Sequence, residues 1–280
     1  MIIDFHAHIF SPRINQERDA YLGRDPVFNI LYADHRAKLA SAEDIVRSMD
    51  EAGVDVSVVL NIGWTSHELC VETNDYLMEA SARYPKRLVG FGVVQPKAGE
   101  AALREIERCA KGGLRGIGEM RADAQGYDMG DEALMKPLLE QAQKHNMILL
   151  THSSEPVGHR YQGKGMITPE VLYRFVSLAS QADVVLAHWG GGLPFYALMP
   201  EVARAFERVS FDTAAWSFLY GGDIFKYGVS LVGAQKILFG TDYPLLGQKK
   251  SIQRIRDLNL EKTVEAAILG ENARRLLKLG

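Results

Sequence analysis

Six side chains that can bind a metal ion are spread over almost the whole chain. They are His6, His8, Glu119, His152, His188 and Asp242. Each follows or ends an apolar run that is typical of a β-strand. Because the carboxyl ends of neighbouring parallel strands meet at one rim, we expect all six to converge there. Imidazoles and carboxylates without a thiolate suit Zn²⁺, Mn²⁺, Fe²⁺ or Co²⁺, so the sequence predicts a divalent-metal site.

The first of these runs, residues 2–8, carries two of the candidate ligands. Residues i and i+2 of a strand point to the same face, so His6 and His8 are expected to project together. Ile3 and Phe5 are then expected to project to the opposite face. Asp4 shares the parity of the histidines but lies deeper, and we expect it to orient a neighbouring group rather than to bind the metal.

Strand-like and helix-like segments alternate along the rest of the chain. β-Branched and apolar runs predict seven further strands at 54–61, 88–94, 114–119, 147–152, 184–188, 209–213 and 236–242. Capping residues and glycine or proline stops predict helices at 41–53, 66–84, 99–111, 132–145, 169–181, 195–207, 222–232 and 261–279. The eight strand–helix units predict an α/β fold, a (β/α)₈ TIM barrel, with residues 1–280 as one domain.

An open, doubly wound sheet is the competing architecture. It usually carries a glycine-rich phosphate turn after its first strand, and this chain has His-Ala-His there instead. Two connections exceed the usual few residues, 9–40 and 153–168, and long loops in compact domains commonly form lids or binding loops.

Composition argues against several kinds of partner. The net charge of −3 gives no basic face for nucleic acid. No apolar run approaches the about 18 residues that suggest a membrane span, and the first residues do not read as an export signal. Cys70 and Cys109 are the only cysteines, and we expect them to be buried in a cytoplasmic protein.

The predicted site has a clear chemistry. A divalent ion can lower the pKa of a bound water to about 7, which supplies hydroxide at neutral pH. Asp242 is placed to take the proton of this water. His188 is expected to lie opposite and to polarise a substrate oxygen.

Three motifs carry a resemblance to a known family. They are Asp4-Phe5-His6-Ala7-His8, Ala187-His188-Trp189-Gly190-Gly191-Gly192 and Phe239-Gly240-Thr241-Asp242-Tyr243-Pro244. Together with His152 and the closing Gly270-Glu271-Asn272-Ala273, they resemble the amidohydrolase superfamily. The most similar branch contains aminocarboxymuconate-semialdehyde decarboxylase and related decarboxylases, lactonases and hydratases. The resemblance implies that His6, His8, His152 and Asp242 bind one metal ion, that His188 is a catalytic or substrate-orienting imidazole, and that the protein forms a homodimer.

Glu119 departs from the one-metal pattern of that branch. Two-metal members of the superfamily carry a carbamylated lysine at the end of strand four or, in the TatD-type hydrolases, a bridging glutamate. If Glu119 bridges, His152 and His188 can hold a second ion. If it does not, Glu119 is expected to bond to a ligand histidine or to Arg121. Zn²⁺ is the favoured ion, and the number of bound ions, one or two, remains open.

Four residues are candidates for substrate binding. His159, Arg160 and Tyr161 lie in the long connection 153–168, where lid residues commonly touch substrate. Trp189 follows a strand end and is expected to pack in the wall of the site or to line it.

The sequence favours a metal-dependent hydrolase that attacks a small anionic ester, lactone or amide with a metal-activated water. The alternative is a metal-dependent non-oxidative decarboxylase of a small carboxylic acid. A decarboxylase must recognise a carboxylate, for which arginine is best suited. We place the available arginines in loops rather than at strand ends: Arg13, Arg24, Arg36, Arg121 and Arg160. A binding protein that has lost catalysis is a third hypothesis, for which the full ligand set would be needless.

Overall fold

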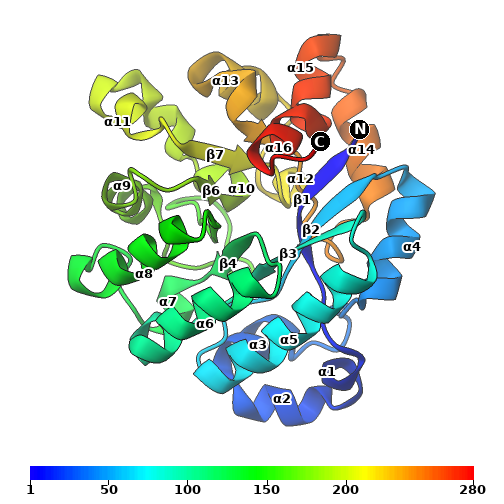
Figure 1. The fold of residues 1–280 in the computed structure, drawn as a ribbon. Helices are drawn as coiled ribbons and strands as arrows, with labels where there is room; N and C mark the ends of the chain where they lie inside the picture. The colour runs from blue at the N-terminus through cyan, green and yellow to red at the C-terminus, as the bar shows by residue number, and fades with distance from the viewer.

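The computed structural model describes residues 1–280, and its eight strands form one parallel sheet in chain order (Figure 1). The strands are β1 (Ile3–His8), β2 (Val56–Leu60), β3 (Leu88–Gly92), β4 (Gly116–Met120), β5 (Ile148–Thr151), β6 (Val184–Leu186), β7 (Val209–Asp212) and β8 (Ile237–Leu238). Backbone hydrogen bonds join the first strand to the chain that follows the last. The Phe5 N–H donates to the Phe239 carbonyl (2.7 Å), and the Asp242 N–H donates to the His6 carbonyl (2.9 Å). The predicted (β/α)₈ barrel is confirmed.

Helices surround this sheet (Figure 1). The longer ones are α4 (Ala42–Ala52), α5 (His67–Arg83), α6 (Glu100–Lys111), α8 (Glu132–Lys144), α9 (Pro169–Leu178), α13 (Asp223–Val232) and α14 (Gln248–Arg256). The shorter ones are α1 (Pro12–Gln16), α2 (Arg18–Arg24), α3 (Pro26–Tyr32), η1 (Pro96–Ala98), α7 (Ala122–Gln125), α10 (Ala187–Gly190), η2 (Leu193–Leu198), α11 (Pro200–Ala205), α12 (Trp216–Leu219), η3 (Ala234–Lys236), α15 (Lys262–Ala266), η4 (Ala267–Glu271) and α16 (Asn272–Leu276). None of these helices combines the length and the apolar character that crossing a membrane requires.

Local sequence explains where helix α4 begins and ends. The Ser41 hydroxyl accepts a hydrogen bond from the Asp44 N–H, and the Asp44 carboxylate accepts one from the Ser41 N–H. This reciprocal pair satisfies two backbone donors at the helix start. Gly53 ends the helix in the left-handed region (φ 69°), which glycine adopts without a steric penalty.

The interior of the barrel contains a cluster of apolar side chains from most of its strands. Ile3 and Phe5 of β1 belong to this cluster, together with Val58, Leu60 and Phe91. Our expectation that Ile3 and Phe5 face away from the histidines was therefore wrong. The pairing of β1 with β2 shifts register between Asp4 and Ala7, and this irregularity breaks the simple alternation of faces.

Asp4 lies on the outer side of β1 as a consequence of this shift. Its carboxylate accepts hydrogen bonds from the Thr241 N–H (3.0 Å), the Thr241 hydroxyl (2.6 Å) and the Gln248 amide of α14 (2.8 Å). It holds the segment that leads to Asp242 and is not among the metal-competent groups, as expected of an orienting residue.

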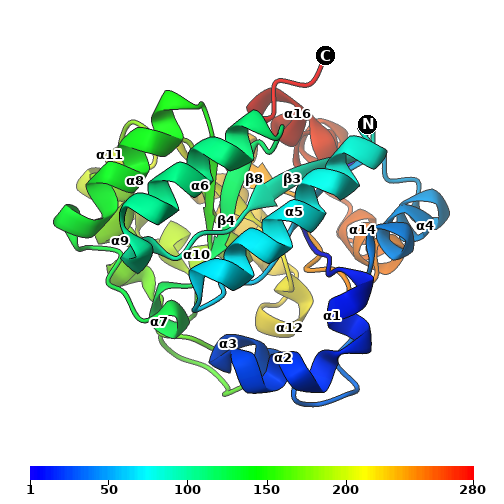
Figure 2. The same cartoon turned by 60° about the horizontal axis from the view of Figure 1, so that its bottom comes forward.

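Two long excursions lie near the carboxyl ends of the strands. Residues 9–40, expected as a loop, contain α1, α2 and α3, which Figure 2 shows on one side of the barrel near α12. Helices of five to seven residues are too short to show a clear apolar period, so the sequence pattern missed them. The second excursion, 153–168, contains no helix or strand.

Candidate metal centre and substrate cavity

Three donor atoms converge at the end of β1. The Nε2 atoms of His6 and His8 lie 3.1 Å apart, and the Asp242 Oδ1 lies 3.1 Å from His8 Nε2 and 3.8 Å from His6 Nε2. Both imidazoles are buried. Asp242 reaches this position from a backbone turn with a positive φ of 63°, just beyond β8.

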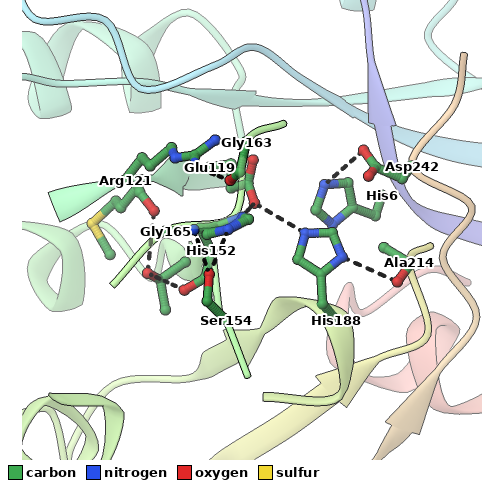
Figure 3. A network of polar contacts seen from close by, with 12 residues as sticks. His6, Glu119, Arg121, His152, Ser154, Gly163, Gly165, His188, Ala214 and Asp242 are labelled. Carbon is green, nitrogen blue, oxygen red and sulfur yellow. Dashed lines mark hydrogen bonds and ion pairs between the residues drawn. The ribbon is translucent and has the colours of Figure 1, made fainter. Parts of the chain in front are cut away.

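Glu119 lies between two groups of histidines (Figure 3). Its Oε2 is 3.8 Å from His8 Nε2, whereas its Oε1 is 2.8 Å from His152 Nδ1 and 3.5 Å from His188 Nε2. Two sets of three ligand atoms result, His6–His8–Glu119 and Glu119–His152–His188. His152 thus groups with Glu119 and His188, whereas the resemblance had implied a shared ion with His6 and His8.

His188 is held by the Asp212 side chain and the Ala214 backbone at the end of the neighbouring strand, β7. Its own backbone is left-handed (φ 54°), and its N–H donates to the Asp212 Oδ1 (3.0 Å). Its ring Nδ1 lies 3.0 Å from the Ala214 carbonyl, which can only accept a proton. The Nδ1 therefore carries a hydrogen, and Nε2 is the atom directed toward Glu119.

Burial and nearby charges set the pKa values of the site. Burial lowers the pKa of His6, but the charge of Asp212 and the hydrogen bond to it outweigh burial and raise the pKa to about 10. Burial also lowers the pKa of His188, yet the hydrogen bond to Glu119 and the charge of Asp242 raise it to about 9. Burial raises the pKa of Glu119, but the charge and hydrogen bond of His152 bring it well below the usual value.

Asp242 follows the same logic as Glu119. Burial raises its pKa, and the hydrogen bond to His8 and the charge of His6 lower the pKa to below its ordinary value. At neutral pH the carboxylates are therefore ionised and both His6 and His188 are protonated. A divalent ion must displace the His6 proton in order to bind at Nε2.

The donor set fits a divalent cation. Ligand atoms that share an ion at about 2.0–2.2 Å are separated by roughly 3.0–3.6 Å, and the distances of 3.1 Å around His8 match that range. Imidazole nitrogens and carboxylate oxygens are ligands that Zn²⁺ and Mn²⁺ both accept. The cluster is nitrogen and oxygen only, because Cys70 and Cys109 are buried away from it.

A cavity of about 410 Å³ opens onto these donors. Metal-competent side chains form part of its lining: His8, Glu119, His152, His188 and Asp242. Much of the remaining wall is apolar and is contributed by Leu31, Ile62, Phe218, Leu219, Pro244 and Leu245. This combination suits a small molecule with an apolar body and a polar end that meets the donors.

Arg121 contributes a buried cation to the cavity lining. It directly follows β4 and is 5% exposed. One Nη atom donates to the Gly163 carbonyl in the 153–168 segment, whereas its Nε has no hydrogen-bond partner (Figure 3). Our placement of Arg121 in a loop away from the strand ends was wrong. Its i+2 spacing from Glu119 was the signal that could have identified it.

The predicted substrate contacts divide into three kinds. His159 and Tyr161 line the cavity, and the Tyr161 hydroxyl donates to Glu155 (3.2 Å). Arg160 is exposed and does not line it. Trp189 is fully buried against Phe225, with ring centroids 5.2 Å apart, so its position contradicts a substrate contact and matches wall packing. The left-handed backbone of His188 and Trp189 turns these adjacent side chains toward different surroundings.

Sequence analysis overlooked Asp212. This residue ends β7, is fully buried, and lies 2.8 Å from His6 Nδ1 through its Oδ2. An acidic residue at the end of a predicted strand was the available signal, the same one that identified Glu119 and Asp242.

Comparison with known proteins establishes the family. The sequence profile of the Amidohydrolase family matches residues 3–279. The chain belongs to the amidohydrolase family. Within it, the chain is 25% identical to 2-amino-3-carboxymuconate-6-semialdehyde decarboxylase of Dictyostelium discoideum over 246 residues, 76% of this chain and 67% of the relative. It is 23% identical to gamma-resorcylate decarboxylase of Polaromonas sp. over 298 residues, 87% of this chain and 90% of the relative.

Solved structures show the same fold. The 5-carboxyvanillate decarboxylase of Sphingomonas paucimobilis superposes with a TM-score of 0.82 at 18% identity, covering 100% of this chain and 99% of that one. The corresponding Novosphingobium aromaticivorans enzyme, with manganese and 4-hydroxy-3-methoxy-5-nitrobenzoic acid bound, gives a TM-score of 0.79 at 17% identity, covering 100% and 96%. The resemblance to the decarboxylase branch is confirmed.

Proposed function

We propose that this amidohydrolase-family chain is a metal-dependent non-oxidative decarboxylase of a small aromatic or enoic carboxylic acid. Our sequence analysis favoured hydrolysis and kept decarboxylation as the alternative. Both curated relatives are decarboxylases, which supports reversing that preference.

The observation that carries the proposal is the guanidinium of Arg121 in the cavity. A decarboxylase needs a cation that recognises a carboxylate, and the sequence had offered none at a strand end. Arg121 provides a buried cation that lines the same cavity as the metal-competent groups. Its Nε makes no hydrogen bond within the protein and lies 3.9 Å from the Asp123 Oδ1. The apolar part of the cavity wall suits an aromatic ring.

The residues of the chain can then divide the reaction between them. A bound divalent ion supplies Lewis-acid stabilisation of negative charge on substrate oxygens. Arg121 binds a carboxylate, and Phe218 and Leu219 hold the apolar body and exclude water. The bond to the carboxyl carbon breaks, carbon dioxide leaves, and its electron pair remains on the vacated carbon. His188, with a pKa of about 9, holds a proton at neutral pH and delivers it to that carbon.

The metal is proposed to be held by His6, His8 and Asp242, with Glu119 completing the set. We predicted Zn²⁺ from the ligand types, whereas the Novosphingobium relative contains manganese. Both ions accept imidazole and carboxylate ligands. Elemental analysis of protein purified without chelator, followed by activity with each ion restored singly, decides between them.

Hydrolysis remains the second candidate because of one observation, the position of Glu119. Its two oxygens face different histidine groups, an arrangement that suits a carboxylate bridging two ions. Two bound ions would supply an activated water, and Asp242 would accept its proton. In that case His188 is a ligand and not the proton donor.

Isotope labelling separates the two reactions. We expect release of carbon dioxide from hydroxylated or methoxylated benzoic acids or from enoic acids, with solvent deuterium on the vacated carbon and no ¹⁸O uptake. Incorporation of ¹⁸O from solvent into products of lactones or esters, without carbon dioxide release, would establish the hydrolase instead. A protein that retains metal but turns over neither the carboxylic acids nor the lactones and esters would favour a binding function. The homodimer stays a prediction for light scattering to test.

A further inference from the structure

Asp212 contacts a candidate metal ligand, His6, but is not itself among the metal-competent groups. Its side chain is fully buried at the end of β7. The Oδ2 lies 2.8 Å from His6 Nδ1, and the Oδ1 accepts hydrogen bonds from the backbone N–H groups of His188 (3.0 Å) and Ala214 (2.9 Å). Both oxygens are therefore engaged, and the carboxylate cannot rotate without breaking these bonds.

The contact with His6 selects one form of the imidazole. An ionised carboxylate oxygen only accepts hydrogen bonds, so the neutral His6 ring that binds a metal must carry its hydrogen on Nδ1. Its Nε2 then presents a lone pair to the position between His8 and Asp242. The opposite tautomer would place a hydrogen on Nε2 and block coordination.

Close packing leaves no room for another arrangement. A Cβ at Gly240 would lie 2.9 Å from the His6 Cβ and 3.5 Å from the Asp212 Cβ, so the backbone of the β8 end closes directly over this pair. A side chain or water could not readily enter there to replace the hydrogen bond. The residue that faces His6 Nδ1 therefore determines which tautomer forms.

We propose that Asp212 is a positioning residue that holds His6 in its metal-binding tautomer, with the backbone of His188 and Ala214 fixing the orientation of the carboxylate. This inference rests on the metal-binding part of the proposed function and not on the reaction. It predicts that Asp212 acts on metal affinity through His6 and through no other ligand.

Asp212→Asn tests the proposal because the two backbone donors dictate how the amide must sit. Its oxygen replaces Oδ1 as the acceptor from His188 and Ala214, so its NH₂ group faces His6 Nδ1. His6 must then accept at Nδ1 and carry its hydrogen on Nε2. Carboxylate partners of metal-binding histidines contribute about 10–100-fold to metal affinity, and we expect the Zn²⁺ dissociation constant to rise by that factor.

Zn²⁺ affinity is measured by competition with a chelator, without substrate, so failure of the decarboxylase proposal does not affect the result. Asp25→Asn is the matched control, since Asp25 is also buried but binds Thr65 and the start of α3. Its dissociation constant is expected to stay within twofold of the native value.

Two further measurements keep the proposal falsifiable if Asp212→Asn is unstable. In a His6→Ala background, titrated with enough Zn²⁺ to load the weakened site, Asp212→Asn is expected to cause no additional loss of affinity, because Asp212 acts only through His6. In the Zn²⁺-loaded native protein, ¹⁵N-edited spectra are expected to show the His6 ring hydrogen on Nδ1. A native-like Zn²⁺ affinity in Asp212→Asn, an equal loss with and without His6, or a hydrogen on His6 Nε2 would each overturn it.

Discussion

Replacement of Arg121 by glutamine tests the feature that distinguishes the proposed decarboxylase from a hydrolase. Arg121 is 5% exposed, and its Nε makes no hydrogen bond and lies 3.9 Å from the Asp123 Oδ1, so a substrate carboxylate would meet a largely desolvated guanidinium. A hydrogen bond to a charged group contributes about 1.5–3 kcal/mol. Taking about 3 kcal/mol for a forked pair, and about 1.4 kcal/mol per factor of ten, we expect kcat/KM to fall by about 10²-fold.

Two variants refine this expectation. Arg121→Lys keeps the charge but loses the planar fork, and we expect its kcat/KM to lie between the values of the native protein and of Arg121→Gln. Arg36→Gln is the control, because the Arg36 side chain is 92% exposed and pairs with Asp34. Its kcat/KM for carbon dioxide release is expected to remain within about twofold of native, as is usual for an exposed ion pair.

Arg121 also donates to the Gly163 carbonyl, so its replacement could act by loosening the 153–168 segment. Binding of a substrate-like carboxylate and of its neutral carboxamide separates the two effects. Loss of charge recognition weakens the carboxylate alone, whereas a loosened segment weakens both. Unchanged kcat/KM in Arg121→Gln, or equal weakening of acid and amide, would refute the assignment of Arg121 as the carboxylate receptor.

Three further predictions concern the metal. His6→Ala and Asp242→Ala are expected to lose the metal and turnover while far-UV circular dichroism stays native, and full metal occupancy with activity in both would contradict the site. If Glu119 bridges, the native protein is expected to contain about two equivalents of metal and the Glu119→Gln variant one or none. One equivalent in each of the two proteins would show that Glu119 is not a bridging ligand. The apparent Mn²⁺ affinity is expected to rise about tenfold per pH unit from pH 7 to 9, because His6, with its pKa raised to about 10, must release a proton on binding. Affinity that is constant over this range would exclude the proton competition.

The raised pKa values of His6 and His188 also define the sign of their effect on stability. A histidine whose pKa in the folded protein exceeds the usual value of about 6.5 stabilises the metal-free fold. This stabilisation is fully present below about pH 6.5. The contribution is lost as pH rises through about 9 and about 10, where His188 and His6 deprotonate.

The sequence by itself determined the barrel and the position of the candidate ligands along it. Short apolar runs, each ending in a histidine or an acid, could be predicted locally because strand length and side-chain type depend on near neighbours in the chain. Parallel strands of a barrel end at one rim, so His152 and Asp242 could be expected near His6 without knowledge of any contact. The family motifs lie in these same strand ends.

Only the tertiary structure decided which groups face one another. The register shift in β1 depends on its pairing with β2, so strict alternation misplaced Phe5 and Asp4. Arg121 became a cavity residue through packing against the 153–168 segment, and Trp189 entered the core because of the left-handed turn after β6. The contact of Asp212 with His6 joins residues 206 positions apart. Such pairings arise from the closure of the barrel, and local sequence carries no record of them.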